Sequence, residues 1–231
     1  MNYLSWKEET ISDFNQKNIS DMYGRGFVFT RKGRGVMQQT RSVRIDLVQF
    51  ELSSENRRIL KKISTVAAKE IALPVTPADY HWSLGKMAKD FYEKKFGAGV
   101  MSASKIKELL TDGQKSNFNT LISFSHLDGA GSESAYAICY KNSTLLHYSY
   151  PFYDLEKMAS GEIPKDIGLG MMILAIEHAK TAGLAHIYLG SLQRPSDTYK
   201  LQFKGLEWFD GGPGGTSTWQ RDIEKAKNIL K

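Results

Sequence analysis

Residues 165–190 constrain the fold of this chain more than any other stretch. Two glycines, Gly168 and Gly170, begin an apolar run that extends to residue 179, and a second apolar run covers residues 184–190. This order predicts a glycine turn, a helix and then a strand. The glycines leave backbone N–H groups uncovered at the helix start, where the helix dipole adds partial positive charge. The stretch therefore indicates a site for a phosphate-bearing donor, although a simple turn before a buried helix would give the same pattern.

The segment before this stretch is typical of an antiparallel meander. Three runs of strand-forming residues separated by short turns predict strands at residues 119–126, 134–140 and 143–150. We expect the turns at residues 128–131 and 141–142. An alternating pattern predicts a half-buried strand at residues 42–50, and glycines on both sides of residues 27–29 predict a hairpin there.

Helices are expected in five further places. The clearest is at residues 83–96, where apolar residues recur at helical spacing on one face. Shorter patterns predict helices at residues 6–18, 57–69, 104–110 and 217–231.

The composition is that of an ordinary globular protein. Hydrophobic residues make up 41% of the 231 residues and charged residues 24%, and there is no run of about 18 apolar residues that could span a membrane. Residues 1–18 are polar and acidic, so we expect no signal peptide. We therefore expect a cytoplasmic protein without a membrane partner.

Positive charge is concentrated in the first third of the chain. The net charge is +6, and residues 25–62 contain ten Lys and Arg residues against three Asp and Glu residues. Three phenylalanines are interleaved with them. This pattern is typical of a surface that contacts a phosphate backbone, but a solvated strand-and-helix face is the alternative.

The cysteine and histidine residues give no sign of a metal site. The chain has one cysteine, Cys139, and it lies in an apolar run where a buried small side chain is the expected state. The five histidines lack the spacing of a metal-binding motif. We therefore expect neither a metal nor a resident cofactor.

The glycine turn resembles a known donor-binding loop. Acyltransferases of the GNAT class bind the pyrophosphate of coenzyme A at a loop of the pattern Q/R-x-x-G-x-G/A, and residues 165–170 read K-D-I-G-L-G. The resemblance implies an α+β fold with a GNAT-like mixed, mostly antiparallel sheet flanked by helices. It assigns the donor to Lys165, Gly168, Leu169 and Gly170.

A second resemblance covers residues 22–219 and is to the aminoacyl-tRNA–protein transferases, the arginyl and leucyl transferases that tag protein N-termini. Residues 53–62 resemble the serine-rich turn, paired arginines and further basic residues of that family, and residues 92–110 resemble its helical insert. Three short motifs follow in the family's order. They are F-Y-D at 152–154, Y-L-G at 188–190 and Y-K-x-x-F at 199–203.

Two departures from this family stand out. The family commonly carries a cysteine cluster near the segment that corresponds to residues 36–44, and this chain has no cysteine there. An aromatic run that follows Y-L-G in the family is replaced by residues 191–195, S-L-Q-R-P. Because of the first departure, a metal or iron–sulfur role tied to that cluster is not carried over to this chain, and the second bears on the choice of substrate and on activity.

The transferase resemblance implies a basic N-terminal extension, residues 1–75, packed on an acyltransferase core, residues 76–231, with a helical insert near residues 83–112. It implies transfer of arginine or leucine from charged tRNA, the co-substrate, to a protein or peptide N-terminus within an N-degron pathway. An activated ester needs alignment and oxyanion stabilisation more than a nucleophile. We assign catalysis to Tyr188 and Lys200, an acceptor with an acidic N-terminus to Arg194 and Lys200, and tRNA phosphates to Arg57, Arg58, Lys61 and Lys62.

Two of these assignments have simpler structural alternatives, and two other functions stay open. Tyr188 could be a core tyrosine, and Lys200 an exposed strand lysine. A coenzyme A-dependent N-acetyltransferase that uses acetyl-CoA would employ the same glycine loop. A non-catalytic tRNA- or peptide-binding relative would fit the missing cysteines and the altered segment after Gly190.

Overall fold

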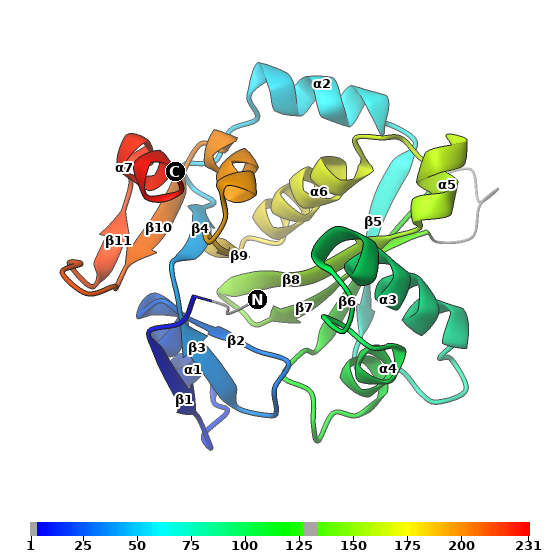
Figure 1. Cartoon of the computed structure of the whole chain (residues 1–231), viewed down its shortest axis with the longest axis horizontal. Coiled ribbons are helices and arrows are strands. Elements are labelled where there is room, and N and C mark those ends of the chain that lie inside the picture. Colours follow the sequence, from blue (N-terminus) through cyan, green and yellow to red (C-terminus); the bar gives the residue numbers. More distant parts are fainter. Residues whose placement is uncertain (1–3, 127–133) are drawn as a thin grey trace. The chain divides into compact units, whose positions relative to one another are not determined.

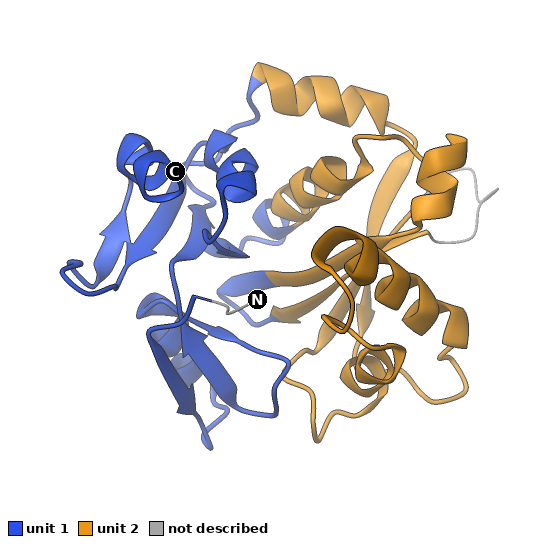
Figure 2. Cartoon of the chain, in the orientation of Figure 1, with its two compact units in different colours: residues 1–53, 141–147, 179–231 blue, residues 54–140, 148–178 orange. Residues whose placement is uncertain are grey.

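The computed structural model describes residues 4–126 and 134–231, so the turn predicted at residues 128–131 lies outside the described residues. Figure 1 shows the elements in chain order. The chain divides into two compact units, and each is assembled from separate segments (Figure 2). Unit 1 comprises Met1–Ser53, Lys141–His147 and Ala179–Lys231, and unit 2 comprises Ser54–Tyr140 and Tyr148–His178.

Among its described residues, unit 1 contains two groups of strands and three short helices. A three-stranded sheet has the order β1-β3-β2, and a second group has the order β11-β10-β4-β9 with the first residues of β8 at its edge. The elements are β1 (Lys7–Thr10), α1 (Gln16–Gly24), β2 (Phe27–Phe29), β3 (Val36–Gln39), β4 (Ser42–Asp46), β9 (His186–Ser191), the 3₁₀ helix η1 (Pro195–Gln202), β10 (Leu206–Asp210), β11 (Thr218–Gln220) and α7 (Ile223–Ile229).

Unit 2 is a meander flanked by helices, with the strand order β8-β7-β6-β5. The β5–β6 and β6–β7 pairs are antiparallel. The elements are α2 (Ser54–Lys62), β5 (Val66–Ala72), α3 (Trp82–Phe96), α4 (Ala103–Thr111), β6 (Thr120–His126), β7 (Ala135–Lys141), β8 (Leu145–Tyr153), α5 (Leu155–Ser160) and α6 (Ile167–Thr181), of which β7, β8 and α6 extend into unit 1.

β8 and β9 form a short parallel pair inside unit 1, from Leu145↔His186 to His147↔Tyr188. A parallel pair needs a long connection, and α5 and α6 supply it. β4 then pairs antiparallel with both β9 and β10. The predicted fold class, a mixed and mostly antiparallel sheet flanked by helices, is therefore confirmed.

The meander strands and the helices α3, α4 and α6 lie where the sequence predicts them. Ser102 begins α4, because its side chain accepts a hydrogen bond from the backbone N–H of Lys105 at 3.1 Å. Within the described ranges, no helix is long and apolar enough to cross a membrane. The domain boundary predicted near residue 75 stays a prediction.

The helix predicted at residues 6–18 is wrong. Lys7–Thr10 instead forms β1, which pairs antiparallel with β3. The helix of this region starts only at Gln16, where the Asn15 side chain accepts a hydrogen bond from the backbone N–H of Asn18 at 2.7 Å. Pairing with a distant strand therefore overrides the local pattern.

The helix predicted at residues 57–69 is wrong in its second half, because the segment contains the end of a helix and the start of a strand. α2 ends at Lys62, and β5 then pairs with β6 from Val66↔His126 to Ala72↔Thr120. The C-terminal helix predicted at residues 217–231 is shortened for a similar reason, because Thr218–Gln220 pairs with β10 as β11. α7 begins after Asp222, whose side chain accepts a hydrogen bond from the backbone N–H of Lys225 at 2.9 Å.

Tyr23 of α1 lies at the centre of the core of unit 1 and is fully buried. Its ring makes edge contacts with Phe29, His147 and Tyr188, the last at a centroid distance of 4.8 Å. The Tyr23 hydroxyl and His147 Nδ1 are hydrogen-bonded at 2.9 Å. Burial lowers the pKa of His147 to about 3, so this imidazole is neutral in the folded protein.

We expect His147 to make the protein sensitive to acid. Below the ordinary pKa of 6.5 the unfolded chain binds a proton that the folded chain excludes until about pH 3, so stability falls as the pH falls through this window. Between pH 6.5 and 4.5 the loss from this group is about 2 kcal/mol. Urea unfolding across this range should show a correspondingly smaller loss in His147→Asn. The exposed His81 provides the control, since His81→Asn should keep the wild-type slope, and equal slopes in all three proteins would contradict this assignment.

Candidate functional site

Tyr188 lies on β9, next to β4 in the second strand group of unit 1. Strand pairing places Arg44 of β4 opposite Tyr188 and also opposite Glu207 of β10. The Tyr188 hydroxyl accepts a hydrogen bond from an Arg44 terminal nitrogen at 3.4 Å. Arg44 also donates to Glu207 Oε2, with Nε and a terminal nitrogen each at 2.7 Å.

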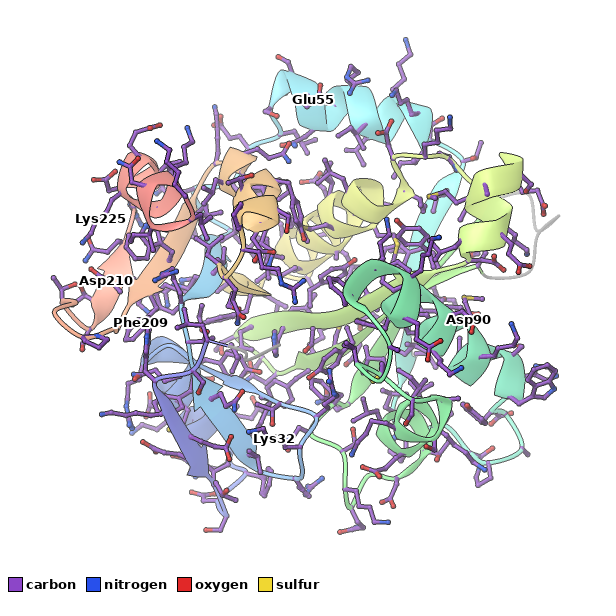
Figure 3. All side chains as sticks on the ribbon, in the orientation of Figure 1. Lys32, Glu55, Asp90, Phe209, Asp210 and Lys225 are labelled. Carbon is purple, nitrogen blue, oxygen red and sulfur yellow. The ribbon has the colours of Figure 1, made fainter. Side chains whose placement is uncertain are left out.

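Besides Tyr188 and Glu207, the Arg44 guanidinium contacts an aromatic ring. It lies 4.0 Å from the ring centroid of Trp219 on β11. Glu207 accepts a further hydrogen bond from Arg221 Nε at 2.8 Å. Asp210 follows Phe209 at the end of the same strand and forms an ion pair with Lys225 at 2.8 Å; Figure 3 labels these three residues.

The surroundings of Tyr188 keep its hydroxyl protonated. The residue is 2% exposed and packs against Tyr23 and Trp219. Burial raises the pKa of Tyr188, and the positive charge of Arg44 opposes this rise. A neutral buried phenol can donate a hydrogen bond but does not supply a base.

Lys200 is buried, so the alternative of an exposed strand lysine is wrong. It lies in η1 with 8% of the residue exposed, and its amine donates a hydrogen bond to the Ser191 backbone carbonyl at 2.9 Å. Asp197 Oδ1 is 3.8 Å from this amine, and Asp197 Oδ2 accepts the backbone N–H groups of Gln193 and Arg194. Burial lowers the pKa of Lys200; Asp197 opposes the shift and the Arg194 charge adds to it. Within residues 191–195, Ser191 therefore binds this amine directly, and Gln193 and Arg194 bind the carboxylate beside it.

The donor-loop residues lie at the start of α6 in unit 2. A Cβ at Gly170 would lie 2.5 Å from Ile63 Cδ1, and a Cβ at Gly168 would lie 3.2 Å from the Tyr153 ring. Both glycines therefore have a packing reason to be present. Gly170 donates its N–H to the Asp166 carbonyl, whereas in the described part of the chain the N–H groups of Gly168 and Leu169 make no hydrogen bond.

The four cations assigned to tRNA lie on the exposed face of α2, while Asn56 and Ile59 form its buried face. Arg58 pairs with Glu55, and Lys62 pairs with Asp166 at 2.5 Å. The hydrogen bond from Arg58 lowers the pKa of Glu55, and the one from Lys62 lowers the pKa of Asp166. Exposed pairs of this kind add little stability, so these cations can exchange a carboxylate for a phosphate at little cost.

The predicted residues divide between the two units. Tyr188, Arg194 and Lys200 belong to unit 1, whereas residues 165–170 and the α2 cations belong to unit 2. Within unit 1, Arg194 lies close enough to Lys200 to influence its pKa. Sequence reasoning missed the contacts of Arg44 with Glu207 and Trp219, because these partners follow it by more than 160 residues.

Cys139 is fully buried and burial raises the pKa of its thiol, which confirms the interpretation as a small core side chain. Among residues 4–126 and 134–231, no group of three or more His, Cys, Asp or Glu side chains is placed to hold a metal ion.

No family model matches this chain. It is similar to a protein curated as an aspartate/glutamate leucyltransferase from Hyphomonas neptunium, with 24% identity over 176 residues. The match covers 74% of this chain and 66% of that relative, slightly less than two thirds of its length. This similarity confirms the resemblance to the aminoacyl-tRNA–protein transferases.

Two solved structures are similar to this chain at lower sequence identity. The structure of L-PGS from Bacillus licheniformis has a TM-score of 0.46 and 12% identity, over 76% of this chain and 52% of that chain. A GCN5-related glucosamine N-acetyltransferase region of a fungal multi-domain GH3 β-N-acetylglucosaminidase has a TM-score of 0.45 and 14% identity, over 87% of this chain and 22% of that chain. Both scores are below 0.5.

We expect Gly170→Ala to destabilise the protein through Ile63. Overpacking costs about 1–3 kcal/mol, whereas the gain in helix propensity is at most about 1 kcal/mol. Ile63→Val removes the atom that lies 2.5 Å from the added methyl group, so the cost of Gly170→Ala should fall by about 1 kcal/mol in that background. Urea unfolding of the two single variants and the double variant measures this coupling. Gly24→Ala is the control, since nothing lies within 4 Å of its Cβ, and strictly additive costs would rule out the packing explanation.

Proposed function

We propose that this chain transfers an aminoacyl group, arginine or leucine, from a charged tRNA to the N-terminal amine of a protein or peptide. The observation that carries the proposal is the 176-residue similarity to a leucyltransferase, together with the order of the motifs at residues 53–62, 152–154, 188–190 and 199–203. The proposed reaction requires no cysteine, since the ester is already activated.

The chemistry needs one bond exchange. The amine nitrogen attacks the ester carbonyl, a C–N bond forms, and the C–O bond to the tRNA ribose breaks; the amine loses one proton and the ribose oxygen gains one. A hydrogen-bond donor that stabilises the oxyanion is the main requirement. Tyr188, protonated and hydrogen-bonded to Arg44, takes that role. Lys200, whose pKa is lowered by burial, takes the proton from the attacking amine.

The acceptor in this proposal carries an acidic N-terminal residue. The relative is named for aspartate and glutamate, and Arg194 lies close to Lys200 in this chain. A guanidinium beside the reacting amine would attract a carboxylate side chain. The amino acid added to the N-terminus of a cytoplasmic protein would then act as an N-degron.

Two groups of unit 2 residues bind phosphates of the donor tRNA in this proposal. The N–H groups of Gly168 and Leu169, with Lys165, face the terminal nucleotide, because a helix N-terminus favours a phosphate. Arg57, Arg58, Lys61 and Lys62 contact phosphates further along the tRNA.

We expect labelled amino acid to move from a pool of charged tRNAs to reporter peptides. Peptides that begin with Asp or Glu should be labelled, and their Asn and Gln counterparts should be labelled less. Label supplied as acetyl-CoA in a parallel reaction should not be transferred. Transfer from acetyl-CoA alone would identify an N-acetyltransferase, and tRNA binding without any transfer would identify a non-catalytic relative.

The α2 surface makes a separate prediction about tRNA binding. Replacing Arg57 and Arg58 together with alanine should weaken tRNA binding and reduce the slope of log K against log salt by about one for each phosphate that the variant no longer neutralises. Filter binding or anisotropy at several salt concentrations measures both quantities. Lys94→Ala with Lys95→Ala is a control of equal charge on exposed residues of α3. An equal effect in the control would show that only net charge matters, and an unchanged slope in the α2 variant would remove the surface from the proposal.

A further inference from the structure

The hydroxyl of Tyr188 accepts a hydrogen bond but donates none within the described part of the chain. Among the described residues it makes one hydrogen bond, the one that it accepts from Arg44. A phenol hydroxyl can accept and also donate. Because the guanidinium occupies a lone pair, the hydroxyl hydrogen must point away from Arg44, and it has no acceptor in the described part of the chain.

Several contacts besides the hydrogen bond to Tyr188 fix the Arg44 side chain. Two of its nitrogens bind Glu207, its plane lies against Trp219, and strand pairing fixes its backbone between β9 and β10. The Arg44 and Glu207 side chains are only 15% and 9% exposed. A planar guanidinium fixed on two sides presents its remaining terminal nitrogen in one direction.

We propose that Arg44 is a positioning residue for Tyr188 in the transfer reaction, an inference that rests on the proposed function. Arg44 fixes the hydroxyl so that its hydrogen points to the oxyanion of the tetrahedral intermediate. Its positive charge also stabilises the electron density that moves onto the phenol oxygen when that hydrogen is shared. Glu207 and Trp219 hold the guanidinium in place for this purpose.

Arg221 offers a matched comparison within the same network. It donates to the other oxygen of Glu207, at 2.8 Å, but its side chain is 62% exposed and, among the described residues, it makes no hydrogen bond to Tyr188. If Arg44 only stabilises the network, its replacement should change kcat as little as replacement of Arg221 does. If Arg44 positions Tyr188, its replacement should lower kcat as replacement of Tyr188 does.

The test is a kinetic comparison of Arg44→Met, Tyr188→Phe, their double variant and Arg221→Met in the tRNA-to-peptide assay. Loss of one oxyanion donor costs on the order of 100-fold in kcat, so both Arg44→Met and Tyr188→Phe should lower kcat by at least about tenfold and leave KM for tRNA within about twofold. The double variant should be no worse than Tyr188→Phe alone, because the two residues act as one unit. Arg221→Met should keep kcat within about twofold, in line with the small effect of an exposed pair.

Chemical rescue separates positioning from a general loss of structure. In Arg44→Ala, which leaves space between Glu207 and Trp219, millimolar guanidinium should restore part of kcat, and it should have no effect on Tyr188→Phe. Thermal unfolding of each variant checks that it is folded. Full activity of Arg44→Met, additive losses in the double variant, an equal loss in Arg221→Met or failure of rescue would overturn the role of Arg44. A wild-type protein that transfers nothing from charged tRNA would instead refute the proposed function, and the inference with it.

Discussion

The ion pair between Arg44 and Glu207 is the interaction on which the strand group of unit 1 depends. A guanidinium on a side chain that is only 15% exposed must be paired, since an uncompensated buried charge costs several kcal/mol. The pairing fixes β4 against β10, and the same guanidinium contacts Tyr188 on β9 and Trp219 on β11. One charged group thus contacts all three of the other strands in the order β11-β10-β4-β9.

The sequence predicts elements well where local pattern and tertiary pairing agree. The meander strands are readable as continuous runs of strand-forming residues, of which β7 is buried along almost its whole length, and α3 is readable from its one buried apolar face. The pattern fails at residues 57–69, where a basic helix leads without a clear break into β5, and the partner of β5 follows more than 40 residues later. The site divides in the same way, since Tyr188 and Lys200 belong to readable motifs, whereas Arg44 has no local mark and acquires its partners only in the folded chain.

The glycines of the donor loop illustrate how a binding motif and a packing constraint can share residues. Gly170 leaves room for Ile63, and Gly168 leaves room for the ring of Tyr153. At the same helix start, the backbone N–H groups of Gly168 and Leu169 make no hydrogen bond in the described part of the chain. A motif of this type is therefore weak evidence for a ligand when it is considered alone, and its weight comes from the other motifs that accompany it in order.

The division of unit 1 into separated segments has a consequence for synthesis on the ribosome. β4 ends at Asp46, but its neighbours β9 and β10 begin at His186 and Leu206. At translation rates of about 5–20 residues per second, β4 waits on the order of 10 s before either neighbour has been made. During that time Val43 and Ile45, both fully buried in the finished protein, have no strand to cover them. All residues of unit 2 have been synthesised once residue 178 is made. The apolar residues that stay unpaired longest in the nascent chain therefore lie near its N-terminus.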